Sequence, residues 1–190
     1  LNYSCFLSDS GNYEAALSVL GQLPADPETL VKKGQIHELS GNDSEAEKVF
    51  DQALSIFPEN TEVASEAAAF FYRAGLYGRA ETVLARFDEI PADSAILNLA
   101  GNLARVRGNF GAAFDAYEKS LAVDFDPVVA LNYAEGLCES LDYSGAADLL
   151  ERFFPVPGKS LQEQLSEKGP AMSSEKEGAL LEREKRLRER

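Results

Sequence analysis

The sequence predicts an all-α fold built as a solenoid of antiparallel helix pairs. Three observations support this prediction: one short motif recurs about every 33 residues, the apolar residues of each copy recur at helical spacing, and Gly or Pro marks most segment ends. A chain of 190 residues arranged in this way needs no single compact core, because each unit packs on its neighbours.

The clearest copy of the motif is GNFGAAFDAYEKSL at 108–121, in which a Gly-Asn turn precedes a small Ala, and a large residue follows four positions later. The recurrent small residues are Ala16, Ala46, Ala80, Ala113 and Ala146. The last four lie 34, 33 and 33 residues apart, whereas the first interval of 30 predicts a first unit about one helical turn short. We expect each Ala to let two helices approach closely, with the large residue filling the space beside it.

A second segment precedes each copy of the motif, at 1–10, 30–40, 64–74, 97–107 and 130–140. Its apolar residues recur at three and four positions, as in Leu97, Ala100 and Leu103, which is helical rather than strand spacing. Each unit is therefore predicted to be two helices joined by a tight turn.

The turn between the two helices carries Gly41, Gly75 or Gly108. A Gly just past a helix end takes the left-handed conformation that closes the helix. Leu141 stands at this place in the fifth unit, so we expect its turn to be strained or closed differently, and this unit to be the loosest of the later four.

Proline predicts where units end, because it cannot continue a helix interior. The residues at these ends are Pro24, Pro27, Pro58, Pro91 and Pro155, while Phe125 takes the corresponding place at the fourth boundary. The predicted units are 1–24, 27–58, 61–91, 94–126 and 127–155.

These features together resemble the tetratricopeptide repeat (TPR) family. The matching residues of the fourth unit are Leu97, Ala100, Gly101, Gly108, Phe110, Ala113, Tyr117 and Leu121. The resemblance covers about residues 1–155 and implies a right-handed superhelical array whose first helices line a concave groove. It further implies a non-enzymatic scaffold that binds a peptide or helix of a partner protein. The Lys and Asn clamp of TPRs that hold chaperone tails is missing, which excludes that ligand.

Polar residues of the later first helices are the candidate groove contacts: Tyr72, Arg73, Asn98, Asn102, Arg105, Asn132 and Glu135. An Asn pairs with an extended peptide backbone through both its donor and its acceptor, and an Arg holds a carboxylate bidentately. The alternative is that these side chains are simply the solvated face of a repeat helix.

The composition of the chain argues against several classes of function. The formal net charge of −14 argues against a nucleic acid or an anionic membrane as the main partner, and no apolar run is long enough to span a bilayer. The only histidine, His37, takes a position that is usually a packed aromatic, and Cys5 and Cys138 lie in repeats far apart. We therefore predict no catalytic residue, no metal site and no cofactor.

The composition changes after residue 155. Residues 1–155 carry 25 acidic and 10 basic residues, whereas 156–190 carry 7 and 8. We expect 156–190 to be a linker followed by a helix that either caps the last unit or projects from it. Two alternative functions stay open: self-assembly into a homo-oligomer, and a regulatory or tethering segment of a larger protein. The cytoplasm is the favoured location, with the periplasm as the alternative if a signal segment was removed.

Overall fold

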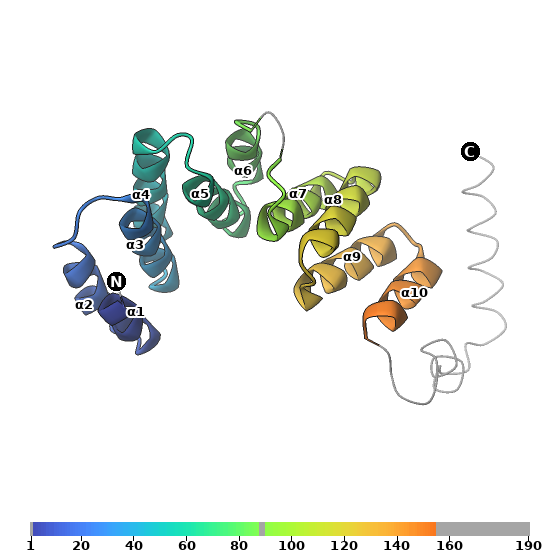
Figure 1. Cartoon of the computed structure of the whole chain (residues 1–190), viewed down its shortest axis with the longest axis horizontal. Coiled ribbons are helices and arrows are strands. Elements are labelled where there is room, and N and C mark those ends of the chain that lie inside the picture. Colours follow the sequence, from blue (N-terminus) through green and yellow to red (C-terminus); the bar gives the residue numbers. More distant parts are fainter. Residues whose placement is uncertain (1, 88–89, 155–190) are drawn as a thin grey trace.

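The computed structural model describes residues 2–87 and 90–154, and within these ranges all regular structure is helical (Figure 1). The helices in order are α1 (Asn2–Asp9), α2 (Tyr13–Leu20), α3 (Pro27–Leu39), α4 (Asp43–Ile56), α5 (Thr61–Arg73), α6 (Tyr77–Leu84), α7 (Ser94–Val106), α8 (Phe110–Val123), α9 (Pro127–Glu139) and α10 (Tyr143–Phe153). The predicted all-α class is confirmed. The predicted capping or projecting helix at 156–190 lies outside the described residues.

The helices alternate in two rows along an elongated array, from α1 and α2 at one end to α9 and α10 at the other (Figure 1). Each odd-numbered helix packs against the even-numbered helix that follows it, and α3, α5, α7 and α9 also contact one another in sequence. We call these odd-numbered helices the first helices and their shared surface the inner face. The even-numbered second helices form the outer face.

The turns within the units have one geometry. Gly11, Gly41, Gly75 and Gly108 have φ of 74–75°, in the left-handed region, as predicted for the last three of them. Leu141 adopts the same conformation with φ of 68°, and Asp142 N–H donates to Leu137 O just as Asn42 N–H donates to His37 O. The fifth turn is therefore closed like the others, and it is strained because a Cβ disfavours this region.

The recurrent alanines lie where the helices meet. Ala16, Ala46, Ala80 and Ala113 have no exposed surface, and Ala146 is 4% exposed. The large residues four positions later include the fully buried Phe50 and Tyr117. This confirms the expected close approach at each Ala.

A glycine in the first helix makes a second close approach. A Cβ on Gly34 would lie 2.7 Å from the Phe50 ring, and a Cβ on Gly101 would lie 2.6 Å from the Tyr117 ring. Each aromatic ring thus rests directly on the backbone of the facing helix, which fixes how the two helices of the unit cross.

Two second helices are short. Both α2 and α6 have eight residues, whereas α4 and α8 have fourteen. A short first unit was predicted, whereas the early end of α6 at Leu84, well before the predicted unit end at Pro91, was not. In register, Asp88 takes the place of the buried Leu54 in α4, so a continued helix would turn a carboxylate into the core.

Candidate functional site

The predicted groove residues all lie on first helices. Tyr72 and Arg73 are on α5, Asn98, Asn102 and Arg105 are on α7, and Asn132 and Glu135 are on α9. The structure brings several of them together by bonds between one first helix and the next. The inner face is thus crossed by side-chain bridges between units.

Asn98 and Asn132 form one such bridge. The Asn132 side-chain amide nitrogen Nδ2 donates to Oδ1 of Asn98 at 3.1 Å, and both residues are partly exposed. The other polar atom of each amide, Nδ2 of Asn98 and Oδ1 of Asn132, has no hydrogen-bond partner among the described residues. One donor and one acceptor therefore remain side by side on the inner face.

Arg105 forms a second bridge between α7 and α9. Its Nη1 lies 2.9 Å from Oε2 of Glu135 and 2.7 Å from Oε1 of Glu139. The side chain is 14% exposed and crosses over Gly136, where a Cβ would lie 3.3 Å from its Cδ. Burial disfavours the guanidinium charge, but the surrounding Tyr117, Glu139 and Glu135 raise the pKa of Arg105 above its usual range.

The bridges between α3 and α5 involve residues that the sequence reasoning did not select as groove contacts. Glu38 accepts two bonds from Arg73, from Nε at 2.6 Å and from Nη2 at 2.8 Å, and these bonds raise the pKa of Arg73. Gln35 Nε2 donates to Oε2 of Glu66 at 2.9 Å. A sequence signal for such pairs exists, because complementary side chains lie about one repeat apart, as Glu38 and Arg73 do.

Asn102 and Tyr72 have packing roles. Asn102 is 9% exposed, and its Oδ1 accepts a 2.7 Å hydrogen bond from the Tyr117 hydroxyl. The partly buried Tyr72 ring lies 5.4 Å from that of Tyr77 on α6. Asn102 therefore joins α7 to α8 within the fourth unit.

Both inner-face arginines are already paired with carboxylates. Arg73 pairs with Glu38, and Arg105 pairs with Glu135 and Glu139 through Nη1, so a ligand carboxylate would compete with these partners. The bridged side chains include the cations Lys32, Arg73 and Arg105 and the carboxylates Glu38, Glu66, Glu135 and Glu139. The inner face thus carries an excess of negative charge.

Comparison with known proteins agrees with this architecture. The sequence profile described as a tetratricopeptide repeat matches residues 39–103. Residues 39–103 thus match the tetratricopeptide repeat (TPR) family, and the helical array as a whole has the TPR-type fold. Human tetratricopeptide repeat protein 7B is 28% identical over 104 residues, which is 53% of this chain but only 12% of that relative. The chain thus spans a small part of the length of the curated relative that it matches.

Two solved structures resemble this TPR array. MamA (41-end) from Desulfovibrio magneticus RS-1 superposes with a TM-score of 0.65 and 23% identity, covering 82% of this chain and 94% of MamA. PilF from Pseudomonas aeruginosa gives a TM-score of 0.70 and 21% identity, covering 86% of this chain and 78% of PilF. At these identities the likeness shows the fold. TPR folds generally mediate protein–protein interactions.

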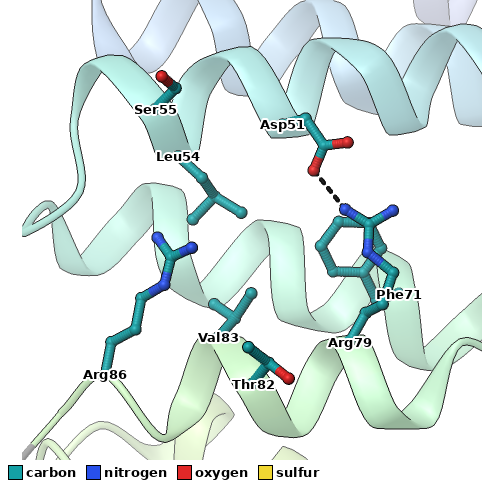
Figure 2. A pocket seen from close by; sticks show the side chains of 8 residues that line it. All are labelled: Asp51, Leu54, Ser55, Phe71, Arg79, Thr82, Val83 and Arg86. Carbon is teal, nitrogen blue, oxygen red and sulfur yellow. Dashed lines mark hydrogen bonds and ion pairs between the residues drawn. The ribbon is translucent and has the colours of Figure 1, made fainter.

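The outer face of the TPR array carries grooves between successive second helices. The groove between α4 and α6, of about 390 Å³, is shown in Figure 2. Its floor includes the Phe71 ring, over which the Arg79 guanidinium stacks at 4.0 Å, and Arg79 also pairs with Glu47 and Asp51 of α4. Arg79 therefore fastens α6 to α4 across one end of this groove.

None of the helices in the described part of the chain is both long and apolar enough to cross a membrane.

Proposed function

We propose that the inner face of this TPR array binds an extended, neutral-to-basic peptide segment of a partner protein and acts as a non-enzymatic scaffold. The observation that carries the proposal is the Asn98–Asn132 bridge, which leaves one amide donor and one amide acceptor open. A peptide backbone presents the complementary carbonyl and N–H groups at every residue, so one ligand residue can satisfy both.

The charge of the inner face supports a neutral-to-basic ligand. Arg105 Nη1 already serves two carboxylates, which leaves Glu135 and Glu139 only partly neutralised. The net charge of −14 on the whole chain adds a long-range attraction for cations. A Lys or Arg of the ligand beside Glu135 would complete the charge balance, whereas an acidic ligand would be repelled.

The partner peptide can be found by selecting a phage-displayed random peptide library on the wild-type chain. We expect the selected sequences to be rich in Lys and Arg. Calorimetric titration of a selected peptide should then show roughly tenfold or more weaker binding to Asn98→Ala/Asn132→Ala, since two hydrogen bonds are lost.

Gln52→Ala is the matched control, because Gln52 is an exposed amide on α4 of the outer face. It should bind the peptide like the wild type. Equal affinity of the selected peptide for the double variant and the wild type, with both folded by circular dichroism, would refute the role of the Asn pair.

A further inference from the structure

The outer face is hollowed between α6 and α8. Two adjoining cavities of about 550 and 330 Å³ lie here, and Ala100 and Ala104 of α7 line both. Leu84 and Phe87 form the wall on the α6 side, and α8 contributes Ala112 and Ala116 to the other wall. We call this surface the middle outer groove. It is an apolar channel whose floor is a first helix.

The shortness of α6 creates this groove. Six residues fewer than in α4 or α8 correspond to about 9 Å of missing helix. In α4 the equivalent turns place the buried Ala53 and Leu54 against the next first helix, α5. No helix of the described residues supplies such turns over α7, where the partly exposed Ala100 and Ala104 line both cavities together with Ile90.

The polar contacts beside the middle outer groove differ from those of its neighbours. Arg79 ties α6 to α4, and across the next groove the Tyr133 hydroxyl of α9 donates to Glu118 of α8 at 3.0 Å. In the middle outer groove, Glu81 of α6 accepts two 2.8 Å hydrogen bonds from Arg107, which follows α7. Among the described side chains, no hydrogen bond or ion pair joins α6 directly to α8, so a ligand can lie on Ala100 and Ala104 beside the Glu81–Arg107 pair.

Shape and charge indicate the occupant. Compared with α4, α6 lacks its last turns beside α7, and the alanines that line the floor let a helix backbone approach closely, so large aliphatic side chains are needed to fill the space. The opposite charges of Asp115 and Lys119, which line the groove, cancel each other locally. The net charge of −15 on residues 1–155 therefore sets the sign of the surrounding field, which favours a basic ligand.

We infer that the middle outer groove docks an amphipathic helix of a partner protein, with aliphatic residues on its buried face and Lys or Arg on its flanks. This docked helix replaces the missing turns of α6. The site lies on the opposite face from the Asn98–Asn132 pair, so the array can hold two segments at once.

The test uses a fluorescent peptide of Leu and Lys at helical spacing, together with a scrambled peptide of the same composition and charge. Anisotropy titration with the full chain should show tighter binding of the helical peptide. Ala112→Arg places a bulky cation in the groove wall at an exposed position and should weaken that binding about tenfold or more. Ala116→Leu, which fills the groove without adding charge, should weaken it as well.

Ala95→Arg is the matched control, since Ala95 is exposed on α7 and does not line the groove. It should leave binding unchanged. Equal affinity for the helical and scrambled peptides, no binding of either, or an equal loss in Ala95→Arg would overturn the proposal. Self-association of the wild type that Ala112→Arg abolishes in light scattering would also overturn it, because the occupant would then be a second copy of this chain.

Discussion

The second unit (α3 and α4) and the fourth unit (α7 and α8) share one packing geometry and differ in chemistry. In both, an aromatic ring of the second helix rests on a glycine of the first, Phe50 on Gly34 and Tyr117 on Gly101. Phe50 is surrounded by hydrocarbon and stacks on Phe70 at 5.0 Å. Tyr117 instead donates a hydrogen bond from inside the core.

The inner face shows the same contrast in its ion pairs. Glu38 of the second unit pairs with Arg73 of the third, whereas Arg105 of the fourth pairs with Glu139 of the fifth, so the charges are reversed at corresponding places. The repeat thus sets where side chains meet, and the residue types at those positions differ from unit to unit. A change of pH or of charge should therefore affect the second and fourth units differently. A change of side-chain size at corresponding positions should affect both units alike.

Alkaline pH should produce the largest difference in stability between the second unit and the units that contain Tyr117 and Tyr133. Burial raises the pKa of both Tyr117 and Tyr133 to about 12, against about 10 in an unfolded chain. The stability that their neutral form contributes is complete below pH 10 and is lost as the pH rises through 12. The predicted second unit, 27–58, contains no tyrosine. Hydrogen exchange at rising pH should show α7–α10 opening before α3 and α4.

The control is the Tyr117→Phe/Tyr133→Phe variant, in which both hydroxyls are removed. Its stability should change less between pH 10 and 12 than that of the wild type. Opening of α3 and α4 first would contradict the assignment of alkaline sensitivity to these two phenols.

Adding a methyl group at Gly34 or at Gly101 should destabilise both units similarly, because the two units share one packing geometry. Gly34→Ala and Gly101→Ala each push a Cβ into a buried ring, which should lower the free energy of unfolding by about 1–3 kcal/mol. Gly111→Ala is the control, because a Cβ there meets nothing within 4 Å and should stabilise α8 by about 0.5–1 kcal/mol. Urea denaturation measures all three. A clear loss at one glycine and none at the other would break the comparison.

Reversing an inner-face ion pair should have the smallest effect. Arg73→Glu faces Glu38 with a like charge and should cost up to about 1 kcal/mol, because the pair is largely exposed. Glu38→Arg/Arg73→Glu, which copies the polarity found between Arg105 and Glu139, should regain most of that loss in a thermal melt. No recovery would mean that the polarity of the bridge is set by its surroundings.

Local signals in the sequence were sufficient to predict the fold. The spacing of Ala80, Ala113 and Ala146 and the left-handed turn positions are properties of single units, so pattern reading found them. The early end of α6 at Leu84 was not predicted, because Pro91 indicated only the end of the unit. Asp88 in the register of Leu54 was the better signal, because a buried carboxylate costs more free energy than an early helix end.

The candidate site was only partly readable from the sequence. The first-helix origin of its residues follows from the repeat, but their bonding depends on how far one unit is offset from the next. The sequence therefore did not show that Arg73 and Arg105 are already paired, or that Asn102 is buried beneath Tyr117. The sequence indicated Asn98 and Asn132 as candidate groove contacts but did not show that they form a hydrogen bond with each other.

The central claim is that the open donor and acceptor of Asn98 and Asn132 bind a peptide backbone. Nuclear magnetic resonance of the side-chain amide groups tests it most directly, during titration with a peptide selected from the displayed library. If the pair binds the peptide backbone, the amide signals of Asn98 and Asn132 shift with the bound fraction while the signal of Gln52 on the outer face stays in place. Unmoved Asn98 and Asn132 signals at saturation would contradict it.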